Sequence, residues 1–73
     1  MSELYSSRHI QKILEHNGFS LVSQKGSHIK LRKMGIPVLT VILPANRKEI
    51  PHGTFRSILR QSQLSAGEFR EAQ

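Results

Sequence analysis

The strongest constraint on the fold is a strict alternation of polar and apolar residues in the segment from His28 to Arg32. In an extended chain Ile29 and Leu31 point to one side, whereas His28, Lys30 and Arg32 point to the other. Such alternation is typical of an antiparallel strand with one face on a core and the other in water. The segment therefore predicts a half-buried strand whose exposed face is basic and includes a histidine.

Two neighbouring segments are predicted to complete a sheet. Phe19–Gln24 is rich in strand-forming residues and is joined to the alternating segment by the turn signal Lys25-Gly26-Ser27. Ile36–Leu43 follows the hairpin-like connection Lys33-Met34-Gly35 and is rich in β-branched residues. A proline near its start, Pro37, indicates an edge strand or a late beginning. We expect three antiparallel strands.

Segments in which apolar residues recur at helical spacing precede and follow these strands. A first helix is predicted with Ser6 or Ser7 as its N-cap and Asn17-Gly18 as its stop. Its buried stripe is Ile10, Ile13 and Leu14. A second helix is predicted from Thr54, after a polar connection over Arg47–Gly53, and its inward side is Phe55, Ile58, Leu59 and Ser62. A short last helix would have Ser65 as its cap and Glu68 at capping-box spacing.

The order helix, three antiparallel strands, helix predicts an α+β fold with both helices on one face of the sheet. The chain has 73 residues, which suits one domain over residues 1–73. It contains no cysteine, so neither a disulfide nor a thiolate metal site can stabilise it. Packing, or binding to a partner, must stabilise the folded state.

Charge favours polyanionic partners. Eleven Lys and Arg oppose five Asp and Glu, a formal net charge of +6, which suits RNA, DNA or an acidic protein.

A membrane surface fits poorly as a partner, because no helix combines a wide apolar face with a strongly basic one. The first residues show no signal-peptide pattern. The longest apolar stretch, Ile36–Leu43, is far shorter than the ~20 residues of a membrane-spanning helix. A cytoplasmic location is expected.

Four motifs follow one another along the chain. A helix ending in Asn17-Gly18-Phe19 leads to Gln24-Lys25-Gly26-Ser27-His28, and an apolar strand then ends in a proline, Leu39–Pro44. After a basic connection comes Gly53-Thr54-Phe55-Arg56-Ser57-Ile58-Leu59-Arg60-Gln61. In this order and spacing the chain resembles the HicA (YcfA-like) toxin family of type II toxin–antitoxin systems, from Ser6 to about Ser65.

The resemblance implies a fold like that of a double-stranded-RNA-binding domain and an activity that cleaves mRNA without the ribosome, a metal ion or a cofactor. The catalytic histidine of the family falls on His28. The partner implied is a HicB-like antitoxin that covers the His28 face. The free toxin would be monomeric, and the complex a larger hetero-oligomer. One departure is Asn46, which stands where many relatives have a histidine after the strand-ending proline.

Metal-free RNA cleavage uses the substrate's own 2′-hydroxyl as nucleophile. A base must remove its proton, an acid must protonate the leaving 5′ oxygen, and cations must stabilise the charged intermediate. Histidine suits either proton-transfer role because an imidazole titrates near neutral pH. We hypothesise that His28 is the base. The candidate phosphate-binding residues are Lys25, Gly26, Ser27, Lys30, Arg32, Arg47 and Lys48.

Other interpretations stay open at this point. A non-catalytic double-stranded-RNA-binding module would need the same fold and charge but no histidine. A DNA-binding domain is weaker, since the start of the second predicted helix offers few base-reading side chains. His9 and His16 are seven residues apart and lack the i, i+4 spacing of helical metal ligands, so no metal site is expected. His52 is interpreted as a turn residue.

Overall fold

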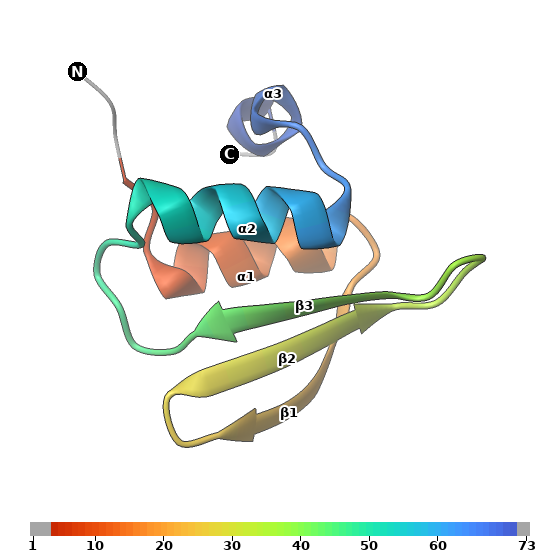
Figure 1. Cartoon of the computed structure of the whole chain (residues 1–73), viewed down its shortest axis with the longest axis horizontal. Helices are drawn as coiled ribbons and strands as arrows, with labels where there is room; N and C mark the ends of the chain where they lie inside the picture. Colours follow the sequence, from red (N-terminus) through yellow and green to blue (C-terminus); the bar gives the residue numbers. More distant parts are fainter. Residues whose placement is uncertain (1–3, 72–73) are drawn as a thin grey trace.

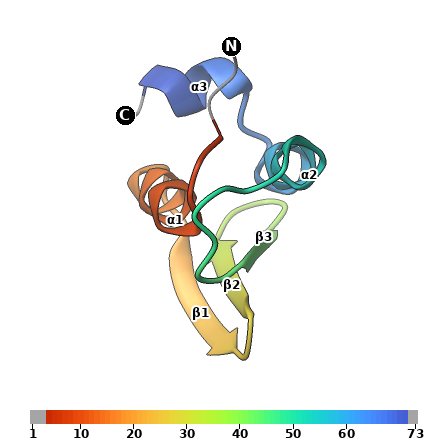
Figure 2. The same ribbon diagram turned by 90° about the vertical axis from the view of Figure 1, so that its left-hand side faces the viewer.

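The computed structural model describes residues 4–71, and its three strands form one antiparallel sheet in the order β1-β2-β3. The elements are α1 (Ser7–His16), β1 (Ser20–Lys25), β2 (His28–Lys33), β3 (Leu39–Pro44), α2 (His52–Ser62) and α3 (Ala66–Glu71). Helices α1 and α2 lie side by side on one face of the sheet, and α3 lies beyond them (Figures 1 and 2). The predicted α+β fold, like that of a double-stranded-RNA-binding domain, is confirmed.

Helix α1 begins and ends where its capping residues predict. The side chain of Ser6 accepts a hydrogen bond from the backbone N–H of His9 at 3.1 Å. At the other end Gly18 has φ +94°, which favours glycine. The N–H of Gly18 then donates to Glu15 O and that of Phe19 to Leu14 O, which is the Schellman arrangement. This arrangement places Phe19 at the exit of the helix.

The predicted start of the first strand was one residue too early. Strand β1 starts at Ser20, because the backbone N–H of Phe19 is used to end α1 and its side chain is buried in the core. The predicted end, Gln24, was also early, since Lys25 still pairs with His28 of β2. Lys25 is therefore the last residue of a strand and not a turn residue.

Strand β3 begins later than expected. The ladder between β2 and β3 closes at the pair Lys33–Leu39, and residues 34–38 form an exposed connection. Ile36, the predicted first strand residue, is fully exposed. Pro37 has no backbone N–H to give to a ladder, which accounts for the late beginning.

Helix α2 begins earlier than expected. Pro51 is its N-cap, with the carbonyl of Pro51 accepting from the N–H of Phe55 at 2.9 Å. His52 and Gly53 therefore lie in the first turn of α2, and the interpretation of His52 as a turn residue was wrong. The sequence offered no Ser, Thr, Asp or Asn at position 51 to mark this start.

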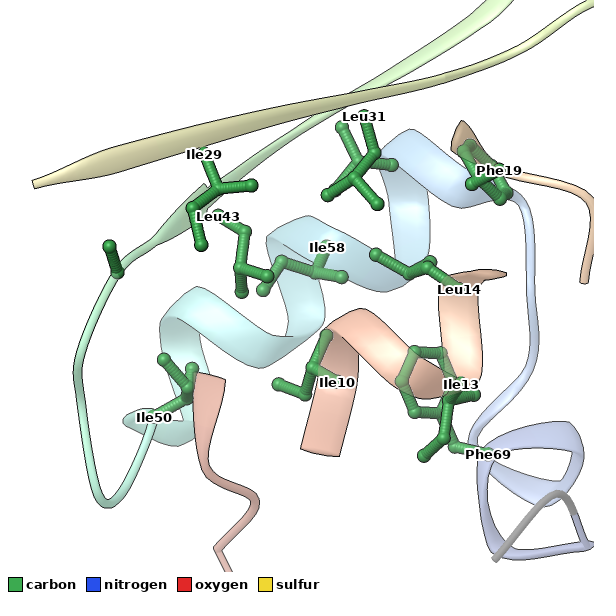
Figure 3. Close-up of a cluster of buried hydrophobic side chains, with 12 residues drawn as sticks. Ile10, Ile13, Leu14, Phe19, Ile29, Leu31, Leu43, Ile50, Ile58 and Phe69 are labelled. Atoms are coloured by element: carbon green, nitrogen blue, oxygen red, sulfur yellow. The ribbon is translucent and has the colours of Figure 1, made fainter. Parts of the chain in front are cut away.

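The core lies between the sheet and the helices. Ile29 and Leu31 point from β2 toward α1 and α2, where Ile58 meets them (Figure 3). Phe69 attaches α3 to this core, with Phe55 packed edge-on against it at 5.2 Å between ring centroids. The buried apolar residues are Ile10, Ile13, Leu14, Phe19, Ile29, Leu31, Val41, Leu43, Ala45, Ile50, Ile58 and Phe69. No helix in the described part of the chain is long and apolar enough to cross a membrane.

Candidate active site

The candidate site lies on the face of the sheet that the helices leave open (Figures 1 and 2). On β2 the predicted alternation is observed: Ile29 and Leu31 are buried, whereas His28 and Arg32 are exposed and Lys30 is half-buried. Because neighbouring residues of a strand point to opposite faces, these three polar side chains share the open face. We call this surface the open sheet face.

Strand register fixes the neighbours of His28. Lys25 on β1 lies opposite it, and Pro44 on β3 lies opposite it on the other side. Directly paired residues have Cβ atoms about 4.5–5.5 Å apart. The imidazole therefore has a lysine beside it on one strand and a side chain without charge on the other.

Two further rows of paired residues extend the open sheet face along the strands. Lys30 pairs with Ser23 on β1 and with Ile42 on β3. Arg32 pairs with Ser20 and with Thr40. Side chains two positions apart on a strand are about 6.8 Å apart. The register thus places His28, Lys30 and Arg32 in one line, with only small or uncharged neighbours beside the last two.

The turn before His28 is short and tied to the rest of the sheet. Gly26 and Ser27 form a two-residue connection, and Gly26 has φ +55°, as the first position of such hairpin turns requires. A Cβ added to Gly26 would meet nothing within 4 Å, so its surroundings are open. The carbonyl of Ser27 accepts a hydrogen bond from Ala45 N–H at 2.7 Å. That bond holds the start of β2 against the chain that leaves β3.

The charge of the sheet is positive. None of the residues in the three strands is acidic, whereas β1 and β2 include four cations in addition to His28: Lys25, Lys30, Arg32 and Lys33. Lys33 belongs to the helix side of the sheet, where its ammonium lies 5.9 Å from the ring centroid of Phe19. The remaining three cations stand on the open sheet face with His28, an arrangement that attracts a polyanion.

Arg47 and Lys48 do not belong to that face. Both are exposed in the connection between β3 and α2. The backbone of Arg47 is bound to the start of α1, because its N–H donates to Ser7 Oγ at 3.0 Å and its carbonyl accepts from Ser7 N–H at 2.9 Å. The predicted phosphate-binding residues therefore separate into a group around the β1–β2 hairpin and a group in the β3–α2 connection.

The structure adds Arg8 and Gln24, which sequence reasoning did not select. Arg8 on α1 and Gln24 on β1 line a cleft together with Arg47 and with Asn46, which the sequence had marked only as a departure from the family pattern. Only the packing of α1 against the β3–α2 connection brings them together, so no local pattern could have indicated the cleft. Asn46 has φ +58°, which asparagine tolerates better than most residues.

The other histidines lie in the helical layer. The ring of His9 on α1 packs edge-on against that of Tyr5 at 5.2 Å between centroids, His16 ends α1, and His52 begins α2. Within residues 4–71 no three His, Cys, Asp or Glu side chains are grouped so that they could hold a metal ion. Of the four histidines, His28 is the one on the sheet.

A comparison with protein-family models agrees with the motifs. A search of curated proteins found no match. A family model described as the HicA toxin of bacterial toxin-antitoxin systems matches residues 7–64, from the first residue of α1 to just beyond α2. That match covers well over half of the chain, and the chain therefore belongs to the HicA toxin family.

Proposed function

We propose that this toxin is an endoribonuclease that cuts mRNA without the ribosome and without a metal ion, and that His28 is its catalytic residue. The observation that supports this most directly is the position of His28. It is exposed at the start of β2, opposite Lys25, on a sheet face with cations and no carboxylate. A phosphodiester attracted to the open sheet face would meet the imidazole at its edge.

The proposed reaction is attack of the substrate's own 2′-hydroxyl on the neighbouring phosphate. His28 removes the proton of the 2′-hydroxyl, and the resulting oxygen attacks the adjacent phosphorus. The bond from phosphorus to the 5′ oxygen breaks, and that oxygen takes a proton from an acid. The products are a 2′,3′-cyclic phosphate and a 5′-hydroxyl. Proton transfer by a positioned side chain contributes about 10²–10⁴-fold to a rate.

In this proposal the cations bind the substrate and stabilise the charged intermediate. Lys25 lies nearest to His28 by register, and Lys30 and Arg32 continue the line along β2. Fixed positive groups next to the reacting phosphate stabilise the negative charge that develops on its oxygens. Gly26 and Ser27 add backbone N–H groups at the turn, where a phosphate can approach closely because Gly26 has no side chain.

Membership in a toxin–antitoxin family implies an antitoxin partner. We propose that a HicB-like antitoxin covers the His28 face and so excludes RNA. A surface with acidic side chains would complement the open sheet face. In this proposal the free toxin acts as a monomer in the cytoplasm, where its mRNA substrate is found, and joins the antitoxin in a larger hetero-oligomer.

A non-catalytic double-stranded-RNA-binding module is the second candidate. The order of elements and the basic face favour it, because shape and phosphate recognition need no proton transfer. The two candidates differ in what His28 does. A binder keeps its function when the imidazole is replaced, whereas a nuclease does not.

Expression in bacteria separates the candidates. Wild type, His28→Ala and the control His16→Ala are induced without antitoxin, and growth and full-length mRNA are followed. His16 is an exposed histidine in the helical layer. Growth arrest with loss of mRNA is expected for wild type and for His16→Ala, but not for His28→Ala. Equal toxicity of all three proteins would remove the catalytic assignment.

A further inference from the structure

A cleft of about 220 Å³ lies on the helix side of the sheet, where β2 begins. Gln24 of β1 and Ile29 of β2 form one wall, and Arg8 and Gln11 of α1 form another. Asn46 follows β3 and closes the cleft together with Arg47. The volume is below the roughly 300–1,000 Å³ of drug-sized pockets, so the cleft can enclose part of one nucleotide, such as its base, but not a duplex.

The cleft is held in shape by hydrogen bonds between distant parts of the chain. Ser7 is only 3% exposed. Its backbone N–H donates to the carbonyl of Arg47, and its hydroxyl accepts from the N–H of Arg47. On the other side of Asn46, Ala45 N–H donates to Ser27 O. Asn46 therefore stands between two fixed residues in a left-handed backbone conformation. A wall fixed in this way loses little conformational entropy when a ligand binds.

The side chains around the cleft match the two polar parts of a nucleotide. Arg8 and Arg47 supply guanidinium groups, which bind phosphate oxygens in pairs of hydrogen bonds. Gln24 and Asn46 supply carboxamides, which both donate and accept and can bind the edge of a base in the same bidentate way. No carboxylate is among the residues that line the cleft. Gln11 Nε2 donates a long bond to Glu15 Oε2 at 3.4 Å, which leaves its carbonyl oxygen for a ligand.

The cleft lies next to the proposed catalytic residue along both strands. Ile29 directly follows His28, and Gln24 directly precedes Lys25. Because neighbouring side chains leave opposite faces of a strand, the cleft and the open sheet face lie on opposite sides of the sheet and border on each other at the β1–β2 turn. One RNA strand that passes around Gly26 and Ser27 would reach both surfaces.

We propose that the cleft binds the nucleotide next to the scissile phosphate, and that Gln24 and Asn46 select its base. This inference rests on the proposed nuclease function and adds a specificity site to it. The two carboxamides carry this assignment, because a bidentate amide can distinguish one base edge from another whereas phosphate contacts cannot.

Cleavage-site preference tests the selection. Wild type, Asn46→Gly and Gln24→Ala cut a synthetic RNA pool with random bases around a fixed position, and the products are sequenced. Glycine keeps the positive φ of Asn46 and removes only the amide. Gln63→Gly is the matched control, because Gln63 is also an exposed amide with positive φ, at the end of α2 and away from the cleft. We expect the two cleft variants to lose about tenfold of the base preference at one position beside the cut. An unchanged profile contradicts the inference.

A binding measurement keeps this test separate from the nuclease proposal. Inactive His28→Ala protein is titrated with each of the four nucleoside 5′-monophosphates and with inorganic phosphate, and amide chemical shifts are followed. The amide signals of Gln24 and Asn46 are expected to shift on titration. The dissociation constant from these shifts should be at least fivefold lower for one nucleotide than for phosphate, and Asn46→Gly should abolish that difference. Phosphate binding as tightly as every nucleotide overturns base selection. Nucleotide binding by a protein whose wild type never cuts RNA would support the cleft and reject the nuclease.

Discussion

At the scale of residues, neighbours on β2 belong to different surfaces because their side chains leave opposite faces of the sheet. Leu31 is completely buried, whereas Arg32 beside it is exposed on the open sheet face. The alternation visible in the sequence was sufficient to assign both. It could not indicate that Arg8 and Asn46 line one cleft, because this depends on how α1 packs against the β3–α2 connection.

Burial predicts very different costs for similar truncations in β2 and in the connection that follows it. Leu31→Ala removes a fully buried side chain and is expected to lower the free energy of unfolding by about 2–5 kcal/mol. Ile36→Ala removes a fully exposed one and is expected to change it by no more than about 0.5 kcal/mol. Urea denaturation of wild type, Leu31→Ala and Ile36→Ala measures both changes in the free energy of unfolding. Equal losses from the two variants would mean that the hairpin connection is packed against something in solution.

At the scale of elements, the sequence predicted each helix and strand but placed several boundaries wrongly. The first helix and the last were right because their caps are made by side chains close in sequence, Ser6 and Ser65. Helix α2 has no such cap, and its start at His52 depends on the backbone of Pro51. The start of β3 depends on where the ladder with β2 closes, which is a property of two strands together.

The last helix offers a pH-dependent prediction. Ser65 N–H donates to Glu68 Oε1 at 2.8 Å, and Glu68 N–H donates to Ser65 Oγ at 3.1 Å. The hydrogen bond from the Ser65 backbone, and after it the one from the Ser65 side chain, hold the pKa of Glu68 below its ordinary value of 4.5. A carboxyl whose pKa is lowered on folding stabilises the fold above its unfolded pKa, and this contribution is lost as the pH falls through the folded pKa.

Melting temperatures of wild type and Glu68→Gln test this at pH 7 and at pH 2.5. Glutamine can keep the capping bond but not the charge, so the comparison isolates ionisation. The variant should melt slightly lower at pH 7, and the two proteins should melt together at pH 2.5. A difference that is the same at both pH values would show that ionisation of Glu68 contributes nothing.

At the scale of the whole molecule, the distribution of charge matters more than its total. The net charge of +6 was known from the sequence. The structure shows that three cations and His28 share the open sheet face, whereas Arg56 and Arg60 lie on the exposed side of α2. Polyanion binding should therefore depend on which cation is removed.

The salt dependence of RNA binding tests this distribution. Each cation that contacts a phosphate adds about 1 to the slope of log binding constant against log salt concentration. In the His28→Ala background, Lys30→Gln and Arg32→Gln should each reduce the magnitude of this slope by about 1. Arg60→Gln should leave the slope unchanged. An equal decrease of the slope for all three variants would mean that RNA does not bind preferentially to the open sheet face.

The antitoxin should stabilise the toxin, because a ligand that binds only the folded state raises the free energy of unfolding. At a free antitoxin concentration 100 times its dissociation constant the gain is about 2.7 kcal/mol. Calorimetric melting of the toxin with and without antitoxin measures it. His28→Ala should gain nearly as much, since one side chain is a small part of a covered face. No upward shift for either protein would argue against a partner on this fold.

We propose that the imidazole of His28 transfers a proton during RNA cleavage. The most direct test of this role is the initial rate at which purified wild type and His28→Ala cut one synthetic RNA, with circular dichroism confirming that both are folded. A rate at least ~100-fold lower is expected for the variant. A folded His28→Ala protein that cuts the RNA at the wild-type rate would show that His28 is not the catalytic residue.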